Sequence, residues 1–279
     1  PDPDNAALGK FLKGIKKAKI NIFGGEPTIR KDLPELIGYI KKSGNLSALF
    51  TNGINISDIE YLKVLKQAGL NEIHLQFDGF NEKTDLKFRN VNLIDNKLKA
   101  LENTATLNIP VVLEITIDEA TNTQEIPRIL KRSFQDWHIR GMCFRSYCAL
   151  GRRGVEINKL TIDNLVAAVE ENSSGKIKSR DIFILQKLIY IIAEWCNFDW
   201  CFSHRYMIIY RRKNKEPLDI GAIFNFKNIE HRLANYLRCS RKNAFFAKIY
   251  FILVIMPGML KLESLVIFMQ LLKTIIMAR

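Results

Sequence analysis

The chain has 279 residues, of which 47% are hydrophobic, and a formal net charge of +13 from 42 Lys and Arg against 29 Asp and Glu. A chain of this size and composition can bury a sizeable core, so we expect it to be folded and not intrinsically disordered. The length favours one large domain with an appendage. The positive charge favours anionic partners, whether nucleic acid, anionic lipid or phosphorylated substrates.

The first half of the chain alternates helix and strand patterns. Apolar residues fall at helical spacing, and Asp32 and the pair Ser57 and Glu60 are residue types that cap helix N-termini. The expected helices cover residues 8–15, 33–40, 59–65, 98–107 and 126–132, and the expected strands cover residues 20–23, 46–50, 72–77, 111–117 and 141–148. This alternation predicts an α/β fold with a parallel sheet and an active site at the carboxyl ends of the strands.

The alternation ends after Gly154, where a helix over residues 161–171 precedes a tail that contains cysteines, basic residues and apolar stretches. We therefore expect two parts, residues 1–155 and a mostly helical extension at residues 156–279. The apolar stretches 245–256 and 265–277 are shorter than the roughly 20 residues of a membrane-spanning helix, so we expect packed or interfacial helices there.

Polar or glycine motifs follow three successive strands. They are Gly24-Gly25-Glu26-Pro27, Thr51-Asn52-Gly53 and Gln76-Phe77-Asp78-Gly79. Two adjacent glycines allow a ligand to approach the backbone, and the carboxylate of Glu26 can bind an ammonium group. Because Gly and Pro are common in turns, a purely structural turn is the alternative for the first motif. Recurrence at three strand ends favours one binding rim.

These motifs resemble those of the radical S-adenosylmethionine (SAM) superfamily, in which a Gly-Gly-Glu-Pro motif holds the SAM amino group. More narrowly, residues 24–30, 51–53 and 75–79, with Arg89 and Gly151-Arg152, resemble the archaeal subgroup that includes tetraether lipid synthase. Members of that subgroup were formerly described as pterin methyltransferases. The resemblance implies that residues 1–155 form a partial (β/α)6-type radical SAM barrel that lacks its first strand.

The resemblance also implies site residues. Glu26 would bind the SAM amino group, and the flanking Gly24, Gly25 and Pro27 would allow close approach to the backbone. The remaining cofactor-binding candidates are Asn52, Gln76 and Asp78 for the polar and ribose groups, and Thr116 and Arg145 for the adenosine or the substrate. The alternatives are strand packing for the threonine and a solvated charge for the arginine.

The cluster motif of the superfamily is missing from this chain. The family holds a [4Fe–4S] cluster in a C-x3-C-x2-C loop, but no cysteine precedes Cys143 here. Because residues 5–19 resemble the helix that follows that loop, we expect the cluster ligands upstream of residue 1 and expect the fragment alone to be inactive. The alternative is a degenerate relative that has lost the motif.

The five cysteines are too spread for a disulfide-stapled secreted domain, which favours a reducing cytoplasm. Cys143 and Cys148 would lie on opposite faces of a strand, as buried small hydrophobic residues. The spacing of Cys196 and Cys201 is similar to a pair downstream of the barrel in the tetraether subgroup. It implies an auxiliary iron–sulfur cluster or a zinc site, with Cys239 as a candidate third ligand, and a site without metal is the alternative.

The resemblance implies an enzyme that cleaves SAM to a 5′-deoxyadenosyl radical, which abstracts hydrogen from an unactivated carbon, with electrons from ferredoxin or flavodoxin. Tetraether-type lipid C–C coupling is the substrate hypothesis, because a basic protein with apolar helices suits a cytoplasmic enzyme peripheral to an anionic membrane. The alternatives are a radical SAM methyltransferase and a non-catalytic relative that binds SAM. Nucleic acid is not expected, because the basic run at residues 211–215 has no accompanying stacking motif.

Overall fold

The computed structural model of the chain describes residues 5–15, 18–149, 156–157, 160–195, 205–208, 210–211, 217–218, 226–240 and 248–255. Its main sheet contains β1 (Lys19–Ile22), β2 (Leu46–Thr51), β3 (Glu72–Gln76), β4 (Val111–Ile117), β5 (Ile139–Ser146) and β8 (Arg205–Ile208). The α-helices are α1 (Asn5–Lys13), α2 (Leu33–Lys42), α3 (Ile59–Ala68), α4 (Glu82–Arg89), α5 (Ile94–Thr106), α6 (Ile126–Gln135), α7 (Ile162–Asn172), α8 (Ser179–Trp195) and α10 (Phe226–Ser240). The shorter elements are η1 (Pro27–Ile29), η2 (Asn55–Ser57), η3 (Thr123–Glu125), η5 (Phe251–Ile255), β6 (Cys148–Ala149), β7 (Glu156–Ile157), β9 (Tyr210–Arg211) and β10 (Pro217–Leu218).

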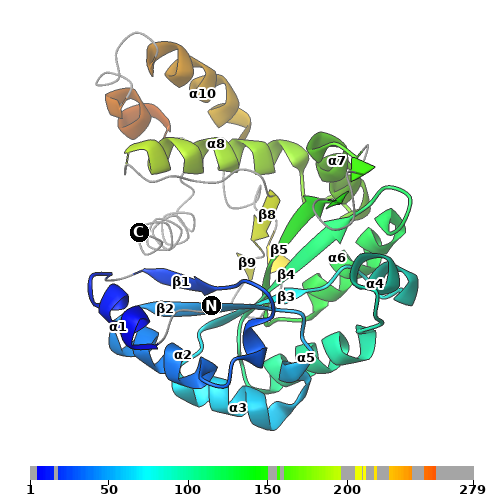
Figure 1. The fold of residues 1–279 in the computed structure, drawn as a ribbon. Helices are drawn as coiled ribbons and strands as arrows, with labels where there is room; N and C mark the ends of the chain where they lie inside the picture. The colour runs from blue at the N-terminus through cyan, green and yellow to red at the C-terminus, as the bar shows by residue number, and fades with distance from the viewer. Residues whose placement is uncertain are drawn as a thin grey trace.

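The sheet has the strand order β1-β2-β3-β4-β5-β8 (Figure 1). Strands β1 to β5 are mutually parallel, because a helical connection separates each strand from the next. This confirms an α/β fold with five parallel strands, consistent with a partial barrel. The sixth strand departs from a (β/α)6 pattern, because β8 follows α7 and α8 and runs antiparallel to β5.

The parallel sheet has one apolar face and one polar face, because side chains alternate along each strand. On the apolar face, Ile73, Leu75, Leu113 and Ile115 are fully buried in a core shared with α2, α3, α5 and α6. Figure 1 shows α2, α3 and α5 along this side of the sheet. The register places the following residues on the polar face: Lys19, Glu72, His74, Gln76, Glu114, Thr116, Cys143 and Arg145.

Five charged side chains form a continuous chain of ion pairs across the polar face. Lys19 contacts Glu72, whose Oε1 lies 2.8 Å from His74 Nε2. Glu114 Oε1 lies 2.6 Å from His74 Nδ1, and Glu114 Oε2 lies 2.5 Å from Arg145 Nη2. His74 and Glu114 are only 5% and 6% exposed. Because buried charges require partners, this ion-pair chain allows the polar face to lie in the interior.

His74 is positively charged in this arrangement, because both ring nitrogens face carboxylate oxygens and only the imidazolium form donates from both. Burial lowers the pKa of His74, but hydrogen bonds to Glu114 and Glu72, together with their charges, raise it above its ordinary value. Burial raises the pKa of Glu72, whereas His74 and Lys19 lower it, and the result is about 2. Both shifts favour the charged forms, so the alternating charges stabilise one another.

Two helix starts differ from the sequence prediction. Asp58 caps α3 by accepting a hydrogen bond from Glu60 N at 2.9 Å, whereas Ser57 belongs to η2 and does not cap the helix. Asp32 precedes α2 without a capping bond, because its carboxylate pairs with Arg30 at 2.8 Å. In both cases, neighbouring polar groups compete for the same hydrogen bonds, and this competition determines whether a given side chain caps the helix.

Beyond β5, α7 packs against α6 and β5, and Leu165, Val166 and Val169 join the core of the sheet. The division at residue 155 stays a prediction.

Phe251 packs edge-on against Tyr236 of α10, with ring centroids 5.6 Å apart, while residues 245–247, 256 and 265–277 of the apolar stretches lie outside the described residues. Within the ranges described above, we find no helix with the length and hydropathy needed to cross a membrane.

A buried ion pair joins α4 to α5. Lys97 Nζ lies 2.5 Å from Asp85 Oδ1, and the two side chains are 0% and 2% exposed. The second carboxylate oxygen of Asp85 accepts a hydrogen bond from Leu93 N at 3.0 Å, so the same residue also holds the turn that leads into α5. Removing either charge leaves the other buried and uncompensated.

We predict that the free energy of unfolding falls as pH rises through the pKa of His74. The folded-state pKa lies above the ordinary 6.5, so the stabilisation is complete below that value and is lost above the folded-state pKa. Urea denaturation from about pH 6 to pH 9 at fixed salt measures the slope. His74→Gln should remove this fall, and His231→Gln, at an exposed position of α10, should keep it. A flat wild-type profile would contradict the assignment.

We also predict that Lys97→Met lowers the free energy of unfolding by about 3–5 kcal/mol, because it leaves the Asp85 carboxylate buried without a counter-charge. The matched control is Lys99→Met on the same helix, where the side chain is 59% exposed and the expected change is within about 0.5 kcal/mol. Urea denaturation of the three proteins compares these values. Equal effects of the two substitutions would show that the buried pair does not stabilise the fold.

Candidate functional site

Glu26 joins the carboxyl ends of β1 and β2. Its Oε1 accepts hydrogen bonds from Thr28 N at 3.2 Å, Thr28 Oγ1 at 2.6 Å and Thr51 Oγ1 at 2.8 Å. Its Oε2 accepts one bond, from Asn52 N at 2.8 Å. A carboxylate oxygen offers about two acceptor positions, so Oε2 of this partly exposed residue retains one with respect to the described residues. That position can accept a hydrogen bond from an ammonium group.

The backbone beside Glu26 is open. Gly24 and Gly25 are exposed, and a Cβ atom added at either position would meet no atom within 4 Å. Gly24 has φ +148, which side chains rarely adopt. Pro27 is buried and begins η1, so it shapes the turn. Open backbone next to an unused carboxylate acceptor fits the amino-acid end of SAM.

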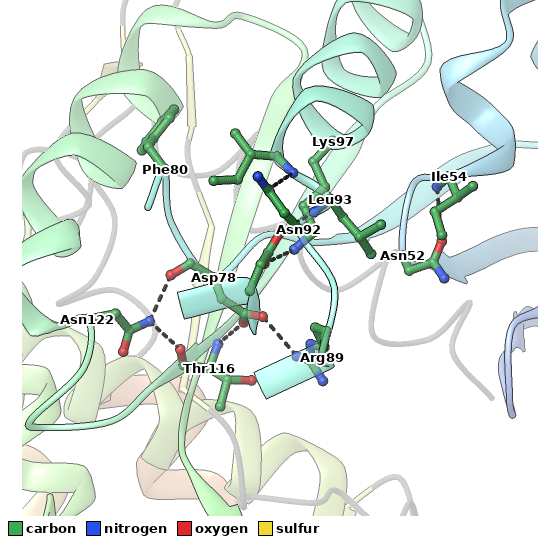
Figure 2. Close-up of polar contacts among 12 residues, drawn as sticks. Asn52, Ile54, Asp78, Phe80, Arg89, Asn92, Leu93, Lys97, Thr116 and Asn122 are labelled. Carbon is green, nitrogen blue, oxygen red and sulfur yellow. Dashed lines mark hydrogen bonds and ion pairs between the residues drawn. The ribbon is translucent and has the colours of Figure 1, made fainter. Parts of the chain in front are cut away.

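The end of β2 contributes Asn52 and Gly53. Asn52 Oδ1 accepts a hydrogen bond from Ile54 N at 3.0 Å (Figure 2), while its backbone N–H donates to Glu26. Gly53 has φ +92, and an added Cβ would lie 2.9 Å from Leu75 Cδ1. The ends of β2 and β3 therefore pack too closely for a side chain at this glycine.

Asp78, at the end of β3, is fully buried and makes contacts within the protein (Figure 2). Its Oδ1 accepts from Thr116 N at 2.8 Å, and its Oδ2 accepts from Arg89 Nη2 at 2.9 Å. Asn122 Nδ2 donates to the carbonyl oxygens of Asp78 and Thr116 at 2.7 and 2.8 Å. Asp78 thus joins the ends of β3 and β4 and orients Arg89.

Gln76, Thr116 and Arg145 lie on the polar face near the strand ends. The register pairs Gln76 with Glu114 and Thr116 with Arg145. In the described part of the chain, the side chains of Gln76 and Thr116 make no hydrogen bond, and Arg145 Nε is buried without a hydrogen-bond partner. Three neighbouring side chains therefore have unused hydrogen-bonding groups.

The sequence prediction of the site did not include His74, Glu72 and Glu114. A signal for them was present, because polar residues alternate with apolar ones along β3 and at Glu114 and Thr116 of β4. Parallel strands covered on both faces usually read as continuous apolar runs. Such alternation in a parallel strand indicates a polar interior face.

The described residues do not supply cluster ligands. Cys143 is buried, as expected, but it lies on the polar face in register with Glu114. Cys196 and Cys201, with Gly151-Arg152, lie outside the described residues, as do the side chains of Cys148 and Cys239. Within the described ranges, no group of three His, Cys, Asp or Glu residues could hold a metal ion.

This chain is similar to a number of curated proteins, among them the following three. It is 38% identical over 193 residues to 7,8-dihydro-6-hydroxymethylpterin dimethyltransferase of Methanocaldococcus jannaschii. The aligned residues cover 65% of this chain and 38% of that protein. It is 36% identical over 169 residues to Fe-coproporphyrin III synthase of Methanosarcina barkeri, covering 60% and 41%. It is 34% identical over 113 residues to a probable GTP 3′,8-cyclase of Pyrococcus abyssi, covering 40% and 36%. The matches thus span 36% to 41% of these relatives' own lengths.

Residues 5–132 also match the radical SAM superfamily. The matched stretch contains β1 to β4 and all three loops of the rim, including Glu26, Asn52 and Asp78. Arg145 on β5 and the helices that follow lie beyond it. The sequence match and the parallel sheet agree, and residues 5–132 of this chain are similar to the radical SAM superfamily.

Proposed function

We propose that this chain is the SAM-binding part of a radical SAM enzyme that abstracts hydrogen from a carbon atom of its substrate. The observation that carries the proposal is the carboxylate of Glu26, which keeps one acceptor position beside the open backbone of Gly24 and Gly25. An ammonium group bound there would receive a charge-assisted hydrogen bond. The match of residues 5–132 to the superfamily supports the same reading.

We assign different roles to the two carboxylates of the rim. Glu26 contacts the SAM amino group, because it is partly exposed and has an acceptor position left. Asp78 positions other groups, because it is fully buried and both of its oxygens are engaged. Through these bonds it holds the backbone of Thr116 and the guanidinium of Arg89 near the rim.

The polar face supplies the remaining candidate contacts. Gln76 and Thr116 can bind the ribose or adenine groups, because each keeps its side-chain donor unused within the described residues. Asn52 can contribute its Nδ2 group, since its Oδ1 already accepts from Ile54 N. Arg145 can bind an anionic group of SAM or of the substrate, because its charged side chain is 34% exposed.

In this superfamily a [4Fe–4S] cluster and SAM together supply a 5′-deoxyadenosyl radical when both are bound. The described residues fit SAM, but they contain no ligand set for the cluster. We therefore assign this chain the binding and orientation of SAM. An auxiliary cluster at Cys196 and Cys201 stays a prediction.

Two substrate classes have specific support. Methyl transfer to a nitrogen heterocycle is favoured by the 38% identity over 193 residues to a pterin dimethyltransferase. Tetraether-type lipid coupling is the second candidate, supported by the net charge of +13, which suits a surface of anionic lipid. A degenerate relative that binds SAM without radical chemistry is the alternative to both.

We predict that Glu26→Gln weakens SAM binding. The substitution keeps the size of the side chain but removes a charge-assisted hydrogen bond of about 1.5–3 kcal/mol, which corresponds to roughly a ten- to hundredfold higher Kd. NMR titration of the chain with SAM measures weak affinities directly. Retained affinity in Glu26→Gln would contradict the assigned role.

The matched control is Glu102→Gln on α5, where the side chain is 60% exposed and SAM affinity should stay unchanged. Because Glu26 also joins two strand ends, the stability of each variant is measured in parallel. A loss of SAM binding that follows only from unfolding would assign Glu26 to structure. A loss in a folded variant supports the contact.

A further inference from the structure

The ion-pair chain on the polar face ends at Arg145, which combines partial exposure with an unused donor. Its side chain is 34% exposed, and its Nε is buried without a hydrogen-bond partner in the described part of the chain. A simple solvated charge would have its Nε in water. The buried Nε indicates that the protein encloses one side of this guanidinium, while the exposed part of the side chain can contact a ligand.

We propose that protonated His74 acts through Glu114 as a positioning residue for Arg145, which binds the carboxylate of a ligand at the open end of the polar face. The inference rests on the proposed function in taking Arg145 as a ligand contact. It goes further by naming the group that Arg145 binds and the two residues that hold Arg145 in place.

The net positive charge at the Arg145 end of the ion-pair chain favours a carboxylate as the ligand. The imidazolium of His74 and the guanidinium of Arg145 flank the single negative charge of Glu114, which leaves one positive charge at this end. At the other end, Lys19 and Glu72 balance each other. A planar guanidinium matches the geometry of a carboxylate, and the neighbouring Thr116 hydroxyl can donate to the same group.

His74 receives its environment from every described strand around it. Glu72 from its own strand and Glu114 from β4 contact its ring nitrogens. Lys19 of β1 pairs with Glu72, Arg145 of β5 pairs with Glu114, and Cys143 lies in register with Glu114. On β2, the ring of Phe50 stacks on the imidazole with centroids 4.0 Å apart and planes at 18°. The ring is thus fixed between its two carboxylates.

The protonation state of His74 controls how strongly Glu114 holds Arg145. With an imidazolium present, Glu114 has two counter-charges, and Arg145 keeps donors for a ligand. With neutral His74, Arg145 becomes the only counter-charge of a buried carboxylate, which draws the guanidinium toward Glu114. Ligand affinity should then fall as His74 loses its proton.

The test uses the ¹⁵N-labelled chain titrated with acetate, a bare carboxylate, while NMR follows the Arg145 Nε–H signal and the His74 ring nitrogens. Acetate should shift the Arg145 signal, and methylammonium, which carries the opposite charge, should not. The response should weaken roughly tenfold as the His74 ring deprotonates. An Arg145 response that persists after deprotonation would overturn the proposal.

Glu114→Gln separates positioning from simple charge. Removing a negative charge beside Arg145 should strengthen acetate binding if charge alone matters, whereas loss of positioning should weaken it severalfold. His74→Gln should also weaken it, and Glu102→Gln should leave it unchanged. Stronger or unchanged acetate binding in folded Glu114→Gln would refute the positioning role.

A parallel titration with SAM identifies the source of the carboxylate. A shift of Arg145 Nε–H with both acetate and SAM assigns it to the amino-acid end of SAM, and a shift with acetate alone assigns it to a substrate carboxylate. In the second case the proposal stands even if Glu26 fails to bind SAM. If neither compound shifts the Arg145 signal, the proposal fails, whatever Glu26 does.

Discussion

The imidazolium of His74 between Glu72 and Glu114 is the interaction on which the polar face of the sheet depends. Its partners lie 2.8 and 2.6 Å from the ring nitrogens, and they belong to two neighbouring strands. Without a positive charge at this point, the buried carboxylate of Glu114 and the partly exposed carboxylate of Glu72 would repel each other across β3 and β4. The parallel sheet can therefore carry charged groups on this face because positive and negative side chains alternate along it. This leaves the outer ends of the ion-pair chain, at Lys19 and Arg145, partly exposed.

At the rim, carboxylates also connect neighbouring strands, but there they accept hydrogen bonds from backbone N–H groups. Parallel strands bring their carboxyl ends together, and a carboxylate from one end accepts N–H groups from the next. Glu26 does this between β1 and β2, and Asp78 does it between β3 and β4. Each bond fixes the loop that follows the strand. The site thus inherits its geometry from the sheet, even though the residues that contact a ligand lie in loops.

The sequence predicted the parallel strands because their signals are local. Apolar periodicity and turn residues marked β1 to β5 to within a few residues, and the alternation of helices and strands predicted that they are parallel. The antiparallel partner β8 could not be predicted in this way, because its pairing with β5 joins segments about 60 residues apart. The contact of His74 with Glu114 could not be predicted either, because 40 residues separate the two along the chain. A shift of one residue in the strand register would also break this contact.

Glu26 and Asp78 show why the roles of site residues are harder to predict than their positions. Both are carboxylates that follow parallel strands, and both were expected to bind the cofactor from their sequence context alone. Burial separates them, because Asp78 is fully enclosed with both oxygens engaged, whereas Glu26 is partly exposed with one acceptor position left. A carboxylate that its own protein encloses completely cannot be reached by a ligand, so its contribution is to orientation. Burial, which depends on packing, therefore distinguishes a binding residue from a positioning residue at this rim.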